Sequence, residues 1–533
     1  ALGALPRLLR ALRRRGPGAA GMLVVGGGAV AGAWAHAGPP AQARGGVSSA
    51  ASPASPAAAA PAAAAPAATA PAAAAPATAP AAAAPAAAPA TAPAATAPAT
   101  PGANAGGALS TLPYAAPIRP SATEPRSLTC PVSFGNESPV FSFRGRAYEY
   151  RSAAQARVAE AGWTQRIRLE RRALDGLVPE DTPAMLIDVR RVRGEPVYAY
   201  YGQGALERTP YEPWSSSKVF AAAAALARVR QESGGLVGGD GRVGRYAVAD
   251  LVTALHAYAP VGEVTAHSNA LGAFFLLTAG AEFTSQLFGA GWLRLDGDES
   301  RFRGTFGVLP FDPETTAWSA PDGTLVERPL SREGLTGEKG MSALAQAEWL
   351  RRLVMHETEP AGRMPGLTAA DVETLLYGSA QRPGEAGGMS AGVSTYLAAA
   401  LTGATTYDDA RSALARVAGP RWRLFHKVGW GDSASRNRSE VVTVGYACLP
   451  ELDGGRELVV ALRTSLAGTP GVAAAGEAHQ AALKAVLQAA LAPAGAVSPA
   501  AAASAAAPSA APLSAAPLSA ATPSAAPLSA ATP

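Results

Sequence analysis

Apolar residues follow a strand-like pattern in two separate parts of this 533-residue chain. In the first part, residues 184–194 and 196–201 are rich in Val, Ile and Tyr and flank a turn that contains Gly194, a pattern typical of a β-hairpin. The second part has three strand-like runs separated by turn residues, at 423–429, 440–447 and 457–464. The sequence therefore predicts strands at both ends of one region.

Helical patterns fill the space between these strands. Ser215 is expected to open a helix, because 219–229 is rich in Ala and Leu and contains no helix breaker. Further helices are predicted at 152–161, 248–258, 270–278, 343–355, 369–376 and 475–490. This order predicts an α+β fold, in which an antiparallel sheet assembled from both ends is flanked by helices and joined to a mainly helical subdomain.

The two flanks of the chain cannot contribute to such a core. Residues 47–108 consist of Ala runs broken by Pro every few positions, and 493–533 repeats short Ser, Ala, Pro, Leu and Thr units. Proline stops helices and almost nothing large is available to bury, so these segments favour extended, disordered spacers. We predict a linker at 38–119, a folded domain at 120–492 and a disordered tail at 493–533.

The basic charge of the chain lies at its start. The formal charge is +5, and an equal number of arginines precede the apolar, Gly-rich run 21–34 and the small-residue site Ala35-His36-Ala37. This predicts a secretory signal peptide in 1–37, with an uncleaved membrane anchor as the alternative. We therefore expect an exported protein of the periplasm, cell envelope or extracellular space. With those arginines removed, the charge does not support nucleic-acid binding.

The chain has two cysteines, Cys130 and Cys448, near the two ends of the predicted domain. In an exported protein they can form one disulfide. Two buried thiols are the alternative, and the sequence alone does not choose between them.

Lysine is rare in this Arg-rich chain, and Lys218 stands three residues after Ser215. A lysine at this spacing lies one turn on along the same helix face, where it can take the serine proton if its pKa is lowered. Of three consecutive serines, only Ser215 has this spacing, because Phe220 follows Ser217 by three. A serine-rich helix cap with a solvated lysine is the alternative.

Together with two later motifs, this pair resembles the penicillin-recognising serine enzymes, above all the class A β-lactamases. Their signature is Ser-x-x-Lys, then Ser-Asp-Asn, then Lys-Thr-Gly. Here Ser215-x-x-Lys218 is followed by His267-Ser-Asn269 and by Lys427-Val-Gly, in matching order and setting over roughly 184–490. The resemblance implies a β-lactamase/transpeptidase-like fold and catalysis through an acyl-enzyme.

The resemblance also implies roles for the residues of the first two motifs. Ser215 would attack the substrate, with Lys218 as the base. His267 would pass a proton to the leaving nitrogen, and Asn269 would orient the substrate and Lys218. Glu299 lies in a segment that resembles the one carrying the family's deacylation glutamate, which activates water; an ordinary loop carboxylate is the alternative.

The third motif implies the substrate-binding residues. Lys427 would keep the cleft electropositive, and Gly429 matches the glycine of the motif. The backbone N–H groups of Ser215 and Trp430 would form the oxyanion hole. Arg436, nine residues after Lys427, matches an arginine that holds the substrate carboxylate; a solvated turn residue is the alternative.

Several positions depart from the family pattern. His267 replaces a serine that relays protons, and Val428 replaces a hydroxyl residue that binds the substrate carboxylate. Arg303 replaces the asparagine that helps to seat the hydrolytic water. Extra residues at 303–339 and 378–408 predict either a lid beside the cleft or inert surface insertions.

These features predict an exported serine hydrolase that cleaves an amide, such as a β-lactam ring or a cell-wall peptide. The alternatives are a D,D-peptidase-like or slowly deacylating penicillin-binding protein, and a catalytically weak cell-wall or partner-binding module on the same fold. We expect a monomer with no cofactor and no metal, because the six histidines show no metal-ligand spacing.

Overall fold

The computed structural model describes residues 127–131, 136–307, 311–332, 334–380, 385–392, 394–404, 406–453 and 455–492. The predicted signal or anchor segment (1–37), the linker (38–119) and the tail (493–533) lie outside the described residues.

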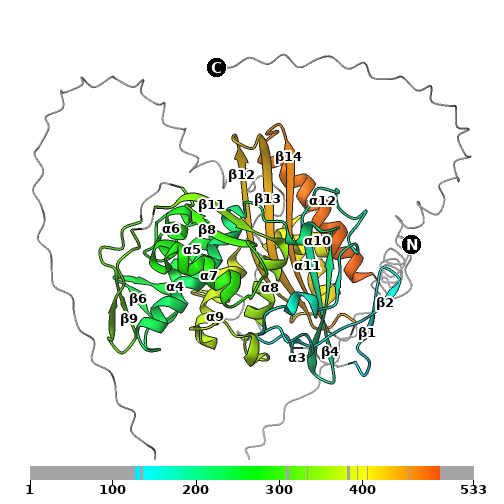
Figure 1. Ribbon diagram of the computed structural model, residues 1–533, viewed down its shortest axis with the longest axis horizontal. Helices are drawn as coiled ribbons and strands as arrows, with labels where there is room; N and C mark the ends of the chain where they lie inside the picture. Colours follow the sequence, from blue (N-terminus) through cyan, green and yellow to red (C-terminus); the bar gives the residue numbers. More distant parts are fainter. Residues whose placement is uncertain are drawn as a thin grey trace, which may run out of the picture. The chain divides into compact units, whose positions relative to one another are not determined.

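A six-stranded sheet holds the fold together, with the strand order β12-β13-β14-β4-β5-β3 (Figure 1). All neighbours pair antiparallel except β3 and β5. The strands are β3 (Leu169–Glu170), β4 (Ala184–Val192), β5 (Glu195–Gly202), β12 (Arg423–Ser433), β13 (Arg438–Leu449) and β14 (Arg456–Ala467). The predicted hairpin and the three late strands thus join in one sheet.

Both faces of the sheet are covered by helices, which is why its strands are apolar almost throughout. Along β4, Met185 and Ile187 face a core shared with Leu350 of helix α8 (Ala343–Val354). Leu186 faces the opposite core, shared with Leu483 of α12 (Val472–Leu491). Side chains alternate between the faces of a strand, so a doubly covered strand buries both sets.

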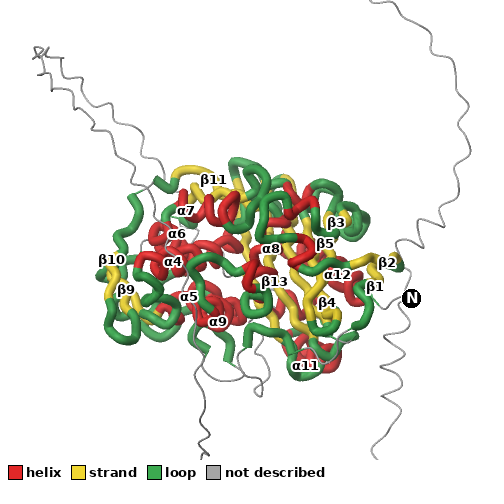
Figure 2. Tube along the Cα trace, turned by 60° about the horizontal axis from the view of Figure 1, so that its bottom comes forward, coloured by secondary structure: helices red, strands yellow, loops and turns green. Residues whose placement is uncertain are grey.

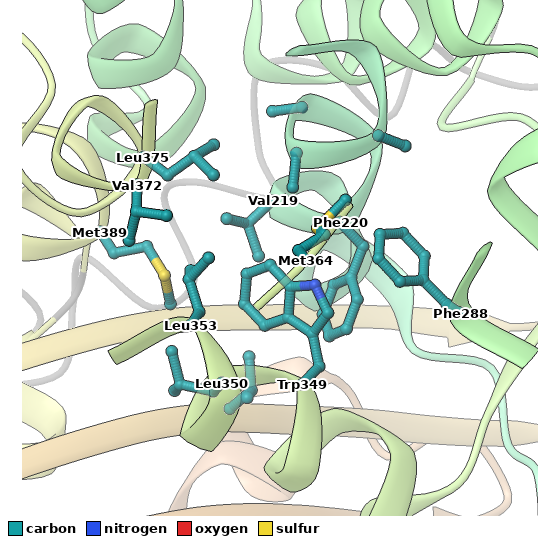
Figure 3. Close-up of a cluster of buried hydrophobic side chains, with 14 of the residues drawn as sticks. Val219, Phe220, Phe288, Trp349, Leu350, Leu353, Met364, Val372, Leu375 and Met389 are labelled. Carbon is teal, nitrogen blue, oxygen red and sulfur yellow. The ribbon is translucent and has the colours of Figure 1, made fainter. Parts of the chain in front are cut away.

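A group of helices lies to one side of the sheet, opposite α10, α11 and α12 (Figure 1). It comprises α4 (Lys218–Glu232), α5 (Val248–Ala257), α6 (Ser268–Ala279), α7 (Ala281–Gln286) and α9 (Ala369–Tyr377). The Ala-rich α4 is buried almost throughout, since small side chains let neighbouring helices approach closely. Phe220 of α4 packs 4.2 Å from Trp349 of α8 between ring centroids (Figure 3), which joins the helices to the sheet.

The first predicted helix is much shorter than 152–161. Helix α3 spans Ala153–Ala156 and has a capping box between Ser152 and Gln155. Arg157 then turns the chain left-handed, with φ 51°. Trp163 is fully buried, and its indole nitrogen donates to the Leu293 carbonyl at 2.7 Å. Burial of this indole stabilises the fold more than further helical turns would, so the helix ends early.

Both predicted insertions contain regular structure. In the first, β8 (Ser300–Gly304) pairs with β11 (Thr336–Met341), while β9 (Ala317–Ser319) and β10 (Leu325–Glu327) extend a small sheet with β6 (Arg242–Val243) and β7 (Tyr246–Ala247). In the second, α10 (Ser394–Thr402) belongs to the helical layer around α12, and α11 (Tyr407–Ala418) begins where the predicted insertion ends. Figure 2 shows β9 and β10 at the outer edge of the helical part.

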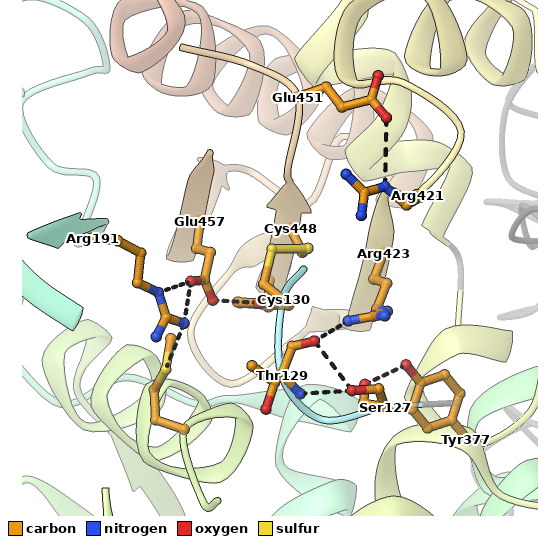
Figure 4. Close-up of a disulfide and its surroundings, with 12 residues drawn as sticks. Ser127, Thr129, Cys130, Arg191, Tyr377, Arg421, Arg423, Cys448, Glu451 and Glu457 are labelled. Carbon is orange, nitrogen blue, oxygen red and sulfur yellow. Dashed lines mark hydrogen bonds and ion pairs between the residues drawn. A yellow bond between two sulfur atoms is a disulfide. The ribbon is translucent and has the colours of Figure 1, made fainter. Parts of the chain in front are cut away.

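A disulfide between Cys130 and Cys448 ties the start of the described domain to β13, with an S–S distance of 2.02 Å (Figure 4). Two hydrogen bonds hold the same segment: the Tyr377 hydroxyl donates to the Ser127 carbonyl at 2.9 Å, and Arg423 donates to the Thr129 carbonyl. A hairpin follows, made of β1 (Val140–Phe143) and β2 (Arg146–Glu149).

In the part of the chain that the structure describes, no single helix is both long and apolar enough to cross a membrane. Two consecutive segments, Ser268–Ala279 and Ala281–Gly291, meet the requirement only together, and they are bent by 87° at the break.

Candidate functional site

Ser215 lies in a short 3-10 turn, Trp214–Ser217, that leads into α4 and lies against β12. The hydroxyl groups of its two neighbours are used locally: Ser216 donates to the Pro213 carbonyl at 2.6 Å and Ser217 to the Trp214 carbonyl at 2.7 Å. Both neighbours are fully buried, whereas Ser215 is partly exposed. Of the three serines, Ser215 is therefore the one available to a substrate.

The residue before Ser215 has a strained backbone. Trp214 has φ 50°, a left-handed conformation that bulky residues seldom adopt. Its backbone N–H donates to Glu212 at 3.1 Å, and its indole nitrogen donates to Glu440 at 2.9 Å. The indole ring also lies against Gly431 of β12, where a Cβ atom would collide with it. These contacts hold the turn in the conformation that presents Ser215.

Lys218 is fully buried one turn after Ser215. Its ammonium nitrogen donates to the Asn269 side-chain oxygen at 2.6 Å and to the Ser268 hydroxyl at 3.0 Å. Burial, and next the charge of Lys339, hold the pKa of Lys218 well below its usual value. Among the described residues, no acidic side chain forms an ion pair with Lys218 that would counteract this effect. The amine can therefore be neutral and accept a proton.

Lys427 approaches from β12 and is also fully buried. Its ammonium donates to the Tyr258 hydroxyl and to the Val428 carbonyl, the latter at 3.4 Å. Burial, and next the charge of Lys218, lower the pKa of Lys427 well below its usual value. Both ammonium nitrogens lie over the ring of Tyr258, which places the two lysines in one site.

Tyr258 separates these lysines, and no motif predicted it. The Lys427 nitrogen lies 3.9 Å from the centroid of its ring, and the Lys218 nitrogen 5.5 Å. The Tyr258 hydroxyl donates to the Val428 carbonyl at 2.9 Å. Burial raises the pKa of Tyr258, and a side-chain hydrogen bond with Ser215 lowers it by less. The signal for such a residue was indirect: the resemblance implied hydroxyl groups at the positions of His267 and Val428, and neither residue has one.

A third lysine reaches the site from the first insertion. The Lys339 ammonium donates to the Thr305 carbonyl at 2.6 Å, pairs with Glu212 at 3.3 Å, and lies 4.7 Å from the Phe306 ring centroid. The same ring lies 5.9 Å from the Lys218 nitrogen. Three of the four lysines of the chain are therefore neighbours. The rarity of lysine in the sequence was the one signal that could have assigned Lys339 to the candidate site.

A neutral histidine, His256, lies in the same buried region. Its Nδ1 atom is 2.8 Å from the Val252 carbonyl, which fixes the proton on that nitrogen. Burial, then the charges of Lys427 and Lys218, lower the pKa of His256 to about 3. Elsewhere in the described ranges, no three or more His, Cys, Asp or Glu side chains are grouped so that they could hold a metal ion.

Two residues of the second motif behave differently. Asn269 contacts Lys218, as described above. His267 is exposed at the start of α6, and its Nδ1 accepts the Asn269 backbone N–H at 3.1 Å, so the imidazole caps the helix. The proton-relay role of His267 stays a prediction.

The side-chain partners of Glu299 are an arginine and a serine. Its carboxylate accepts hydrogen bonds from Arg208, at 2.7 Å for Nε, and from the Ser342 hydroxyl at 2.9 Å. Burial raises the pKa of Glu299, while Arg208 lowers it by less. No ion pair joins Glu299 to Lys218 or Lys339 in the described residues. Its role in activating water stays a prediction.

The remaining predicted residues lie along β12 and the turn after it. Gly429 packs directly against the turn Trp214–Ser217, and the Trp430 ring lies 5.1 Å from the Tyr258 ring. Arg436 is exposed and pairs with Glu440 at 2.8 Å. It lies 5.7 Å from the Trp214 ring centroid, and therefore borders the same turn.

Comparison with known proteins gives distant structural likenesses. No protein-family model and no curated protein matches the sequence. Among solved structures, the protein is similar to a class A β-lactamase from Mycobacterium abscessus, with 15% identity, 57% of this chain and 93% of that chain covered, and a TM-score of 0.30. A β-lactamase from Burkholderia vietnamiensis has 13% identity, 57% and 90% coverage, and a TM-score of 0.31. A mutant of PBP-A in an acyl-enzyme complex with penicillin G has 14% identity, 58% and 90% coverage, and a TM-score of 0.31. Likenesses at these scores carry no weight for activity.

Proposed function

We propose that this protein is a serine acyl-transfer hydrolase of the penicillin-recognising type, which cleaves an amide such as a β-lactam ring through an acyl-enzyme on Ser215. The observation that carries the proposal is the environment of Lys218. This amine is fully buried one turn after the serine, is held by Asn269, and has a lowered pKa. A lysine whose charge is disfavoured in this way is suited to act as a base rather than as a surface cation.

In the proposed reaction, the neutral Lys218 amine takes the proton of Ser215, and the serine oxygen attacks the carbonyl carbon of the amide. Charge then develops on the carbonyl oxygen, which the backbone N–H groups of Ser215 and Trp430 stabilise. The close approach of Gly429 supports this assignment, because it brings β12 beside the Ser215 nitrogen. The C–N bond breaks, the nitrogen leaves with a proton, and water later hydrolyses the ester.

Substrate recognition is proposed to depend on positive charge. Lys427 supplies a buried amine, whose protonated form a substrate carboxylate would favour, and Arg436 supplies a guanidinium beside the turn that carries Ser215. Both suit a small substrate that carries a carboxylate, such as a β-lactam or a cell-wall peptide. The predicted signal segment supports export, so we propose action as a monomer in the periplasm, cell envelope or extracellular space.

One observation favours a second candidate function, a penicillin-binding or D,D-peptidase-like protein that deacylates slowly. Glu299, expected to activate the deacylating water, instead contacts Arg208 and Ser342. Without a carboxylate at the attacking water, an ester on Ser215 would persist.

The test is to incubate the protein with a chromogenic cephalosporin and with labelled benzylpenicillin, and to measure turnover and the mass added at Ser215. Turnover supports the hydrolase, and a stable adduct supports the slowly deacylating protein. Ser215→Ala must abolish both signals, whereas Ser217→Ala, which removes a hydroxyl bonded within its own turn, must retain them. If the unaltered protein shows neither an adduct nor turnover, the hydrolase proposal is refuted and the binding module remains.

Glu299→Gln tests the deacylation role separately. If the contacts with Arg208 and Ser342 are the function of Glu299, the variant melts at a lower temperature but hydrolyses the acyl-enzyme at a rate within about threefold of the parent. If Glu299 activates water, the acyl-enzyme accumulates and its hydrolysis slows by about 10²-fold or more. Single-turnover measurement of the ester on Ser215 separates these outcomes.

A further inference from the structure

We propose that Phe306, contributed by the first insertion, is a positioning residue whose ring shuts the Lys218 amine off from water and so keeps that amine available as a base. The inference rests on the proposed function. It also gives the insertion at 303–339 a part in the site, where the sequence alone left a lid and an inert loop as alternatives.

The ring of Phe306 lies against the stem of Lys218. A Cβ atom added at Gly272 of α6 would be 3.0 Å from the Cδ2 atom of the ring and 2.9 Å from Cγ of Lys218. Both side chains therefore press on the same point of α6, and the contact leaves no room for a methyl group. The ring centroid is 5.9 Å from the Lys218 nitrogen, and Phe306 is 8% exposed. The ring thus forms a wall beside the amine.

Three other groups surround the same amine. Asn269 and Ser268 of α6 accept hydrogen bonds from the Lys218 nitrogen at 2.6 Å and 3.0 Å. The centroid of the Tyr258 ring is 5.5 Å from it. Of these four neighbours, only Phe306 comes from the first insertion. The insertion therefore completes the burial of a residue that belongs to the helical core.

The backbone that presents the ring is fixed by both strands of the insertion. Strand β8 ends at Gly304, where a Cβ atom would be 2.6 Å from a carbonyl oxygen of β11, so the two strands touch closely. The Thr305 hydroxyl closes a turn around Phe306, donating to the Gly307 carbonyl at 2.7 Å and accepting its N–H at 3.2 Å. The Thr305 carbonyl accepts from Lys339 of β11 at 2.6 Å. These bonds hold the ring in place.

The charge of Lys339 gives this wall a second effect. Its nitrogen lies 4.7 Å from the Phe306 ring centroid, and a charge acts on its neighbours more strongly across an apolar group than across water. Burial, and next this charge, hold the pKa of Lys218 well below its usual value. Water in place of the ring would solvate Lys218 and screen Lys339, and both changes raise the pKa of Lys218. The attraction between the ring and the Lys218 ammonium acts in the opposite direction but is weak at 5.9 Å.

The other titratable groups around Lys218 can be told apart from it. They are His256 and Tyr258 at α5, His267 at the start of α6, Lys427 of β12, and Lys339 of β11 with its partner Glu212. Burial lowers the pKa of His256 to about 3 and raises that of Tyr258, so neither changes its charge near neutral pH. His267 is exposed, so its titration affects the parent and the variants alike.

The experiment measures the pKa and the accessibility of each amine separately. The protein is treated with acetic anhydride over a range of pH, and peptide mass spectrometry gives the acetylation rate of each of the four lysines. The midpoint of the rate against pH reports the pKa of an amine, and the plateau at high pH reports its accessibility. Lys484, which is exposed on α12, is the internal reference.

Phe306→Ala should open the Lys218 amine to water. We expect the Lys218 midpoint to move to higher pH by about one pH unit or more, and its plateau to rise about tenfold or more relative to Lys484. The acid limb of Ser215 acylation by benzylpenicillin should move in the same direction. Phe311→Ala is the matched control, because it removes a ring of the same insertion that packs against Tyr246 and Phe274 instead.

The outcomes separate this inference from the proposed function. If the Lys218 profile of Phe306→Ala coincides with that of the parent, or Phe311→Ala moves it equally, the inference is overturned while the hydrolase proposal stands. A Lys218 profile that moves without the acid limb of acylation also overturns the inference, because the shielding then has no part in the reaction. If the parent forms no adduct on Ser215, the proposed function fails, and the inference with it.

A pair of substitutions covers a Phe306→Ala protein that does not fold. Phe306→Leu keeps an apolar side chain beside Lys218, whereas Phe306→Gln places an amide there. We expect Phe306→Leu to keep the Lys218 midpoint close to that of the parent and Phe306→Gln to raise it, because an amide solvates a charged amine and an aliphatic group does not. Equal midpoints in these two variants overturn the inference.

Discussion

Replacing Gly429 by Ala tests whether the contact between β12 and the turn that carries Ser215 is required for the proposed acylation. A Cβ atom at this position would lie 2.6 Å from the Ser215 nitrogen and 2.5 Å from the Ser216 nitrogen. The Pro213 carbonyl oxygen would be 2.7 Å away. These are backbone atoms of one turn, so no side-chain rotation can relieve the overlap.

The size of the effect follows from those distances. Ordinary van der Waals contact begins at 3.4 Å and the closest atom would be 2.5 Å away, so the strand and the turn must separate by about 0.9 Å. The N–H groups of Ser215 and Trp430 would move apart by a similar distance, and a displacement near 1 Å in a reacting geometry costs about 10²-fold in rate. Overpacking of this kind also lowers the free energy of unfolding by about 1–3 kcal/mol.

The assay is acylation of Ser215 by labelled benzylpenicillin, measured beside urea unfolding. The control is Gly362→Ala, where the nearest atom to the added carbon is 3.7 Å away. We expect Gly429→Ala to slow acylation by about 10², and the control to remain close to the parent in both measurements. A Gly429→Ala protein that is acylated at the parental rate would refute the placement of the oxyanion hole between β12 and the turn.

Two further predictions concern charge and covalent linkage. Lys339→Met removes a positive charge that lowers the pKa of Lys218 and leaves Glu212 without its lysine partner. Both effects raise the pKa of Lys218, so less neutral amine is present at neutral pH and the acid limb of the acylation profile moves to higher pH. An acid limb that does not move contradicts this expectation. Replacing Cys130 and Cys448 together by Ser opens a link across 318 residues and should lower the free energy of unfolding by about 2–5 kcal/mol, and urea curves that coincide with those of the parent would count against it.

Much of the sheet could be predicted because its strands are regular and apolar. The hairpin of β4 and β5 and the runs that became β12, β13 and β14 were all visible as short apolar segments bounded by turns. The small sheet was not visible. Its strands β9 and β10 have three residues each, and β9 pairs with β6, far away in the sequence. Such strands are determined by long-range contacts, which local patterns do not contain.

The candidate site also contains residues that the local sequence predicts and residues that only the fold brings together. Ser215 and Lys218 share a helix turn, so their spacing alone predicted their neighbourhood. Lys339 depends on the pairing of β11 with β8, and Tyr258 depends on where α5 ends relative to β12. Neither relation has a local signature. A motif can therefore predict the residues of one element, while the residues that complete a site from other elements need the fold.

Lys218 of α4 and Lys427 of β12 share one physical constraint, which is the cost of burying a charged amine. Lys218 and Lys427 are both desolvated, and in the described residues neither has an ion pair with a carboxylate. The charge of Lys339 disfavours the charged form of Lys218, and the charge of Lys218 disfavours that of Lys427. Hydroxyl, amide and carbonyl groups and the faces of Tyr258 and Phe306 replace the missing counter-charge. A carboxylate placed there by the protein would raise the pKa of Lys218 again. Under the proposed function, that would remove Lys218 as a base, whereas an anionic group supplied by the substrate would pair with Lys427 only when the substrate is bound. The aromatic residues beside the lysines therefore matter to the proposal as much as the lysines.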